Sequence, residues 1–111
     1  MTVLEMAKEL HLEIISKGEA EVREIHGVYC CDLLSIVMGR AKADDAWITV
    51  MGNINAVAVA VLADVSCIVL SEGMGIDEES IAKAQEQDVC ILKSGLPTFE
   101  LSRKIAEFCA L

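Results

Sequence analysis

Apolar residues are concentrated in the middle of the chain, where two apolar runs each lead into a glycine-bearing turn. The first run occupies residues 46–51 and meets Gly52, and the second ends at residue 70, shortly before Gly73. Each run is shorter than the roughly 20 residues of a membrane-spanning helix, and Asp64 and Glu72 prevent the runs from being joined into one. We therefore interpret this stretch as the core, surrounded by more polar, amphipathic segments.

From residue 45 onward the chain shows three units of similar plan, each an apolar strand, a glycine-bearing loop and a helix, with a period of about 20 residues. The strands are predicted near residues 47–51, 67–70 and 89–93. Because they alternate with helices, we expect them to be parallel, with their three loops on the carboxyl edge of one sheet. The pattern predicts a three-layer α/β fold with a mainly parallel sheet, helices on both faces and the Trp47 strand at the centre.

Small polar residues mark the predicted starts of these three helices. Asn53 or Asn55 precedes the first helix, Asp77 the second and Thr98 the third, and we expect each to be an N-cap. The first of these helices is open to another interpretation, because Val57, Val59 and Val61 alternate with alanines at the period of a strand. We favour a helix over 56–63, since the segment is rich in alanine and a hairpin at Gly52-Asn53 prefers the reverse residue order.

The N-terminal part has weaker signals. Thr2 and Glu5 have the spacing of a capping box, which predicts a short opening helix. Residues 12–16 are predicted as a short strand, and residues 22–30 as an extended segment with a kink at Gly27. We expect Asp32 to cap a helix that ends near residue 41.

Length, composition and charge limit the possible partners. With 111 residues, 54% of them hydrophobic and only 4% aromatic, the chain is expected to form one domain over residues 1–111 with an aliphatic core. Its net charge of −9 makes nucleic acid and anionic membrane surfaces poor partners. A small nucleotide stays possible, because backbone N–H groups at helix starts bind phosphate without net positive charge.

The five cysteines are expected to be buried, reduced, structural thiols of a cytoplasmic protein. They follow no disulfide or metal-binding spacing, adjacent Cys30 and Cys31 are expected on opposite faces of an extended segment, and the start of the chain lacks the basic region of a signal peptide. We expect no metal and no cofactor. No nucleophile motif is present, and the paired acids lie at predicted caps and exposed first turns, so we do not expect an enzyme.

The pattern resembles the DRTGG domain family over residues 22–108. The resemblance rests on Asp32-Leu-Leu-Ser-x-Val-Met, Trp47-Ile-Thr-Val-Met-Gly and Ile68-Val-Leu-Ser-Glu-Gly, followed by an alanine-rich helix ending near Gln87 and by Thr98-Phe99. It implies a fold like the N-terminal domain of HPr kinase. Related domains lie beside CBS pairs in some pyrophosphatases and in some phosphotransacetylases, and short stand-alone versions exist in bacteria. The resemblance therefore implies a regulatory or assembly module.

The chain departs from the family pattern where that pattern has its charged and glycine residues. Asn53-Ile54 replaces Asp-Arg, Ser71-Glu72-Gly73 replaces Thr-Gly-Gly, and Pro97 replaces the Asp before Thr-Phe. Loss of the arginine removes the side chain best suited to bidentate phosphate contact.

The glycine loops can be read as a three-loop cradle for a small ligand or simply as the tight turns that strand–helix units require. If a ligand site exists, we expect it on the carboxyl edge, with weak affinity for polyphosphates because Lys93 is the only cation near the loops in the sequence. The residues expected to form it are Gly52, Asn53, Asn55, Ser71, Gly73, Gly75, Ser94, Gly95 and Thr98.

Two functions are therefore expected. The first is a non-catalytic regulatory module that binds a small molecule, such as an adenine nucleotide; the alternative is a protein-interaction or assembly module without a ligand. Both are expected to act as a homodimer, because the segment from Ile54 to Ala63 has no polar face and the chain has too few other elements to cover it.

Overall fold

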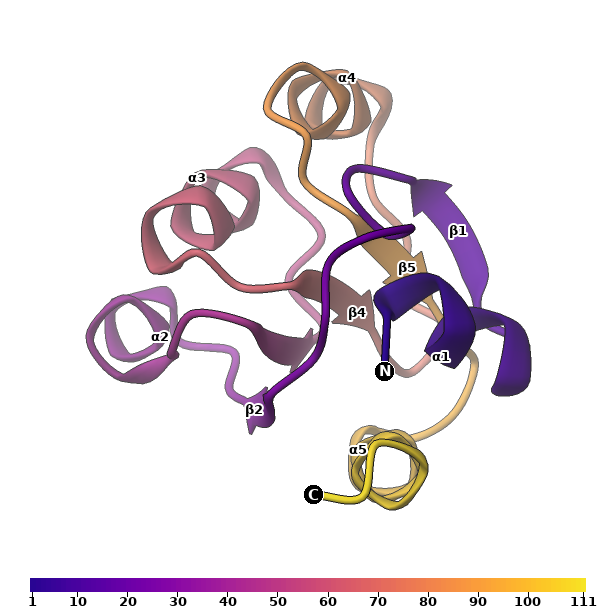
Figure 1. Cartoon of the computed structure of the whole chain (residues 1–111). Helices are drawn as coiled ribbons and strands as arrows, with labels where there is room; N and C mark the ends of the chain where they lie inside the picture. The colour runs from indigo at the N-terminus through magenta and orange to yellow at the C-terminus, as the bar shows by residue number, and fades with distance from the viewer.

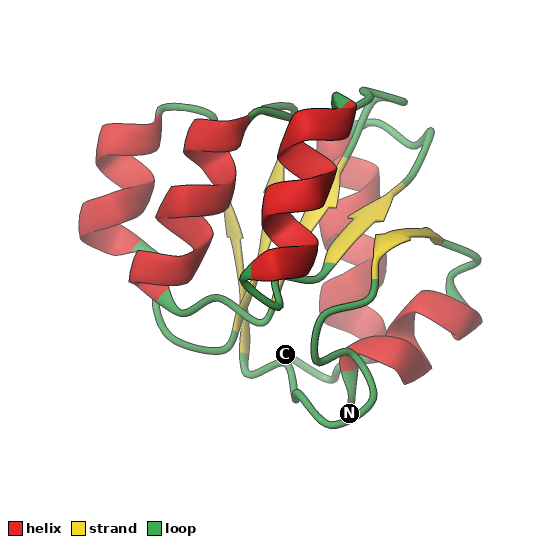
Figure 2. Ribbon diagram, turned by 90° about the horizontal axis from the view of Figure 1, so that it is seen from above, coloured by secondary structure: helices red, strands yellow, loops and turns green.

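The computed structural model describes residues 1–111 as one five-stranded sheet with helices packed on both faces (Figures 1 and 2). This confirms the predicted three-layer α/β architecture. The elements in chain order are α1 (Val3–Glu9), β1 (Glu13–Ser16), β2 (Gly27–Cys30), α2 (Leu34–Arg40), β3 (Asp45–Thr49), α3 (Ile54–Ala63), β4 (Cys67–Leu70), α4 (Glu78–Glu86), β5 (Ile91–Lys93) and α5 (Thr98–Phe108).

The sheet has the strand order β1-β5-β4-β3-β2. Strands β2 to β5 are parallel, and β1 pairs antiparallel with β5. The prediction that the Trp47 strand is central is wrong: the middle strand is β4, and β3 has only β2 outside it. Every residue of β3 and of β4 is buried, because helices cover both faces, so apolar content does not tell the two apart.

The helices divide between the two faces. Helices α1 and α5 cover one face, where Met6 and Leu101 pack with Ile48 and Val69 in the first core cluster. Helices α2, α3 and α4 cover the other face, which includes Trp47 and Ile68. Trp47 is fully buried, and its indole N–H donates to the Cys31 carbonyl oxygen at 2.9 Å, so this large side chain leaves no polar atom unpaired.

The alanine-rich segment after Gly52 is a helix, as predicted. Asn53 is its N-cap, and the side-chain oxygen of Asn53 accepts a hydrogen bond from the Ala56 N–H at 2.9 Å. Val57 and Val59 are buried together with Ala56 and Ala60, whereas Val61 is exposed. The alternation of valines is therefore not a strand pattern, because burial at positions 56, 57, 59 and 60 follows the spacing of a helix rather than every second residue.

The predicted caps have mixed outcomes. Asp77 caps α4, and the capping box formed by Thr2 and Glu5 opens α1. Asp32 does not cap α2, because its carboxylate instead accepts hydrogen bonds from the Thr49 hydroxyl at 2.8 Å and the Val50 N–H at 3.0 Å. Thr98 does not cap α5 either: it is the first helical residue, and Pro97 occupies the N-cap position.

The segment before β2 is less regular than predicted. The strand begins at Gly27, and residues 22–26 contain only an isolated bridge between Thr2 and Glu24. No helix of the structure has the length and apolar character needed to cross a membrane.

Candidate functional site

The loops after β3, β4 and β5 lie at one edge of the sheet, because the three strands are parallel. The structure brings the second and third loops together at their small polar residues. Ser71, at the end of β4, is fully buried, and its hydroxyl lies 2.7 Å from the Thr98 hydroxyl at the start of α5. The N–H of Gly73 donates to the Ser94 carbonyl oxygen at 2.9 Å, so the two loops form one connected unit.

Glu72 supplies a negative charge at the start of α5. Its carboxylate accepts a hydrogen bond from the Thr98 N–H at 2.8 Å, and its own N–H donates to the Leu96 carbonyl oxygen at 2.8 Å. A helix start favours an anion there, because free N–H groups and the helix dipole both point toward it. The carboxylate of Glu72 therefore occupies the position that a ligand phosphate would take at this helix.

The other two helix starts at this edge are also occupied by side chains of the chain itself. Asn53 caps α3, and the Asp77 carboxylate accepts a hydrogen bond from the Ser80 hydroxyl and another from the Ser80 N–H. The hydrogen bonds from Ser80 lower the pKa of Asp77, which keeps the cap ionised. No helix start of the three strand–helix units is thus left without a cap.

The first and second loops meet at two glycines. A Cβ atom on Gly52 would lie 2.2 Å from the Gly75 carbonyl oxygen, which no side chain tolerates. Gly73 has φ of +68° and therefore adopts a backbone conformation that favours glycine. The path of the backbone therefore explains Gly52 and Gly73, whether or not a ligand binds.

Asn55 lies apart from the other predicted site residues. It is exposed on α3 and lines two grooves, one between α3 and α4 and one between α2 and α3. Of the nine residues expected to form a ligand site, it alone lines any of the four hollows of the molecule. The loops at the carboxyl edge are packed against one another and enclose no cavity among these hollows.

The two grooves lie on what we call the outer helical surface, formed by the exposed apolar side chains Met38, Ile54, Val61 and Leu62. Leu62 is 70% exposed, and the other three are about 40% exposed. The groove between α2 and α3 has a volume of about 510 Å³ and is lined mainly by apolar residues. Helix α3 brings no charged residue to this surface.

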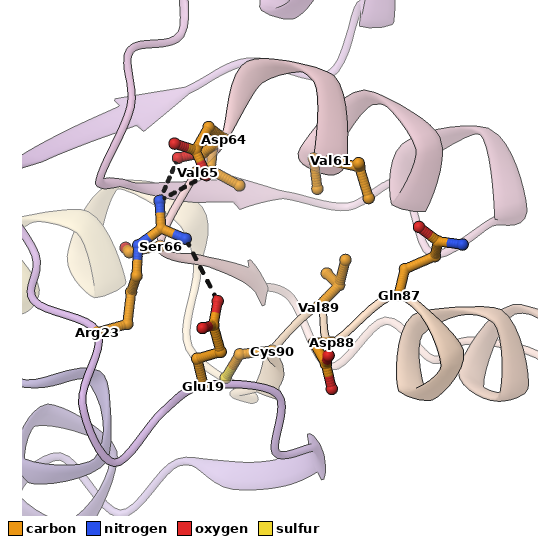
Figure 3. A pocket seen from close by; sticks show the side chains of 11 residues that line it. Glu19, Arg23, Val61, Asp64, Val65, Ser66, Gln87, Asp88, Val89 and Cys90 are labelled. Carbon is orange, nitrogen blue, oxygen red and sulfur yellow. Dashed lines mark hydrogen bonds and ion pairs between the residues drawn. The ribbon is translucent and has the colours of Figure 1, made fainter.

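A smaller hollow of about 100 Å³ opens at the amino edge of the sheet, around Arg23 (Figure 3). The Arg23 guanidinium forms ion pairs with Asp44 at 2.8 Å, Asp64 at 2.9 Å and Glu19 at 3.8 Å. Partial burial by itself lowers the pKa of Arg23, but the hydrogen bonds to Asp44 and Asp64 outweigh it and raise the pKa above its ordinary value. The cluster joins the N-terminal segment to the end of α3.

Sequence reasoning missed this cluster, because Asp44 and Asp64 lie 21 and 41 residues from Arg23 and only Glu19 is close to it in the sequence. In the structure Asp44 and Asp64 both have positive φ, so each ends a turn that enters or leaves a buried element. Arg23 pairs with three carboxylates in this cluster, which is the arrangement of a structural ion-pair network.

The prediction of buried thiols holds for only two of the five cysteines. Cys67 and Cys90 are buried, Cys31 and Cys109 are partly buried, and Cys30 is exposed because it lies on the edge strand β2; all five thiols are free. Cys30 lies near the Ser102 hydroxyl of α5, whereas Cys31 packs with the cluster on the opposite face of the sheet. No three His, Cys, Asp or Glu side chains are close enough to share a metal ion.

A comparison with solved structures finds a protein of similar fold. The solved structure of the CBS and DRTGG domains of the regulatory region of Clostridium perfringens pyrophosphatase, complexed with its activator diadenosine tetraphosphate, superposes with a TM-score of 0.75 and 17% sequence identity. The match covers 94% of this chain and 45% of that chain, so this chain spans less than half the length of its structural neighbour. A comparison with curated proteins finds no match.

The family model of the DRTGG domain matches residues 5–108, so the similarity also includes the N-terminal helix and β1, which lie before the predicted start at residue 22. The resemblance inferred from the sequence motifs is therefore confirmed, and its extent was underestimated. The chain belongs to the DRTGG domain family.

Proposed function

We propose that the chain is a non-catalytic regulatory module, acting as one folded unit that forms a homodimer through the outer helical surface. The DRTGG domain of the structural neighbour belongs to the regulatory region of its enzyme, which supports the regulatory role. The observation that carries the dimer is the exposed apolar face of α3, where Leu62 is 70% exposed and no side chain is charged.

Charge explains why a second copy suits this surface. The chain has a net charge of −9, so most contacts between two copies would bring acids together. Contact through α3 brings no acid into the centre, and a two-fold axis would place the same apolar residues of both copies against each other. Burial of these side chains then provides the association free energy.

Sedimentation velocity at micromolar concentration tests the dimer. We expect a mass of twice 12.0 kDa for the wild type and a folded monomer for Leu62→Glu. Phe99→Glu is the matched control, because Phe99 is 78% exposed on α5, which covers the opposite face of the sheet. A monomeric wild type would contradict the proposal, as would a dimer that survives Leu62→Glu.

We further propose that this module binds an adenine nucleotide or a similar metabolite at the carboxyl edge. The support is the activator of the structural neighbour, an adenine dinucleotide, together with the small and polar residues of the loops. The proposed residues are Gly52, Asn53, Asn55, Ser71, Gly73, Gly75, Ser94, Gly95 and Thr98. Because Glu72 caps α5, a phosphate must displace its carboxylate, and we expect weak binding.

Replacement of Glu72 provides the test. Glu72→Gly restores the glycine of the family pattern and frees the Thr98 N–H, so affinity for AMP, ATP and diadenosine tetraphosphate should rise relative to the wild type. Thermal shifts measure the change, since a ligand at 100 times its Kd adds about 2.7 kcal/mol to stability. Chemical-shift mapping should place the perturbed amides at the three loops, and shifts near Asp45, Ser66 and Asp88 would contradict the site.

An assembly module without a ligand is the second proposal. It is favoured by the closed packing of the carboxyl edge, where Ser71 bonds to Thr98 and Gly73 to Ser94. If neither the wild type nor Glu72→Gly responds to millimolar nucleotide while the dimer persists, this function replaces nucleotide binding.

We also propose a cytoplasmic location. Five free thiols, one of them exposed, are best tolerated in a reducing compartment. Detection of internal disulfides in protein isolated from cells under thiol-blocking conditions would contradict this location.

A further inference from the structure

One edge of the sheet is left open. Strand β2 is the last strand at its side, and it pairs only with β3 (Figure 1). The Cys31 N–H donates to the Ile48 carbonyl oxygen at 3.3 Å, and Tyr29 lies opposite Trp47 in the register, so Gly27, Tyr29 and Cys31 turn their backbone groups toward β3. Val28 and Cys30 therefore turn their N–H and C=O groups away from the sheet.

The two outer strands differ in the features that prevent a further strand from pairing with them. Strand β1 carries the charged Glu13, and its pairing with β5 shifts register between Ile14 and Ser16, two features that discourage addition of a further strand. Strand β2 has the sequence Gly-Val-Tyr-Cys, with no charged residue and a regular register along β3. It retains the properties of a strand that accepts a partner.

Positive side chains gather beside this open edge. His26, Tyr29, Arg40 and Lys42 line a hollow of about 480 Å³ together with Gly27 and Val28. Asp45 also lines it, but this residue is only 8% exposed and its carboxylate accepts the Lys42 backbone N–H at 2.8 Å. The His26 Nδ1 lies 3.4 Å from the Asp44 Oδ2. Arg40 and Lys42 are therefore the two side chains at this hollow whose positive charge has no acidic partner.

Arg40 and Lys42 form no ion pair and lie close together. Of its nine lysines and arginines, four form ion pairs with carboxylates, and Arg40 and Lys42 are two of the five that do not. Both are exposed, and both lie at the same hollow. The net charge of −9 would repel an acidic partner elsewhere, so this position is where such a partner is attracted.

We propose that β2 is a strand-addition site for an extended acidic segment of a partner protein. The backbone of that segment pairs with Val28 and Cys30, and carboxylates at alternate positions lie toward Arg40 and Lys42. A second copy of this chain fits less well, because pairing two β2 strands would bring two sets of Arg40 and Lys42 together. The site lies apart from the outer helical surface and does not depend on the dimer.

A selection from random peptides of about twelve residues, displayed against the full chain, supplies the probe. We expect the selected peptides to carry Asp or Glu at alternate positions. Binding of the synthetic peptides should weaken at least about tenfold in the double variant Arg40→Glu, Lys42→Glu. Lys8→Glu is the matched control, since Lys8 is exposed and unpaired on α1, and it should leave the affinity within about twofold.

Backbone pairing is tested separately from charge. In an extended peptide, the N–H groups at odd and at even positions point to opposite edges. Methylating the nitrogens at the positions that face β2 should abolish binding, whereas methylating those at the other positions should not. Hydrogen exchange at Val28 and Cys30 should slow when the peptide binds.

Four results would overturn the proposal. They are a selection without acidic peptides, tolerance of both methylated sets, displacement of the peptide by millimolar inorganic phosphate with the same chemical shifts, and protection of Val28 and Cys30 that rises with protein concentration alone. The third result would indicate a simple anion site, and the fourth a second copy of this chain.

Discussion

The carboxylate of Glu72 caps the helix that begins at Thr98, with 2.8 Å between the Glu72 Oε2 and the Thr98 nitrogen. Glu72 holds this position with φ of +59°, a conformation that costs a non-glycine residue about 1 kcal/mol. A cap contributes about the same amount, so the hydrogen bond offsets the backbone strain. The contact links the loop after β4 to α5 and closes the edge of the sheet.

Removal of this cap gives the first prediction. Glu72→Ala should lower the free energy of unfolding by about 1 kcal/mol, because it loses the cap and keeps the strain. Glu72→Gly should lose less, because glycine adopts positive φ readily. Urea denaturation measures both values. Glu100→Ala is the control: Glu100 lies in the first turn of the same helix without a side-chain hydrogen bond, and an effect equal to that of Glu72→Ala would contradict the role of the cap.

Val59 and Leu62 should respond differently to the same change. Val59 is 7% exposed and packs in the core beside Trp47, so Val59→Glu buries an unpaired charge and should destabilise the fold by about 3 kcal/mol or more. Leu62→Glu should leave the monomer folded. Circular dichroism during urea denaturation at low protein concentration distinguishes the two, and equal loss of structure in both variants would contradict this assignment of faces.

Arg23 should be the most important surface cation for stability. Its side chain is 21% exposed and pairs with Asp44 and Asp64, so Arg23→Ala leaves carboxylates without a counter-charge and should cost about 2 kcal/mol. Arg23→Lys should recover only part of this, because an ammonium group cannot bind both carboxylates in the same geometry. Lys17→Ala, which breaks an exposed pair with Glu21, serves as the control and should have little effect.

The thiols should divide into two classes. A thiol reagent at pH 8 should react fastest with the exposed Cys30 and more slowly with the partly buried Cys31 and Cys109, whereas Cys67 and Cys90 should react only after unfolding. Burial raises the pKa of Cys67 to about 12 and also raises the pKa of Cys90. Fast labelling of all five thiols in the folded protein would contradict the buried setting.

The same thiols predict a pH dependence. The folded chain keeps Cys67 protonated up to about pH 12, while the unfolded chain loses that proton near its ordinary pKa of 9. The unfolded state therefore binds fewer protons above pH 9, and stability should fall as the pH rises from 9 toward 12. The variant Cys67→Ala should show a shallower fall over this range, and an unchanged slope would contradict the prediction.

The sequence alone determined the elements whose signals are local. The capping box of Thr2 and Glu5, the cap of α3 at Asn53 and the alanine-rich composition of that helix depend on residues a few positions apart. The family motifs also lie within single strand–helix units. From these the α/β class, the parallel strands and the DRTGG membership followed.

The tertiary structure decided what depends on residues distant in sequence. Asp32 and Thr98 have the residue types of N-caps, but Asp32 bonds to Thr49 and Thr98 bonds to Ser71, because neighbouring strands and loops offer these partners. Likewise, β3 and β4 are equally buried, and only the pairing of β5 and β1 beyond β4 makes β4 the middle strand. Local patterns encode which face of an element is apolar, whereas strand order and contacts between loops arise when distant segments pack together.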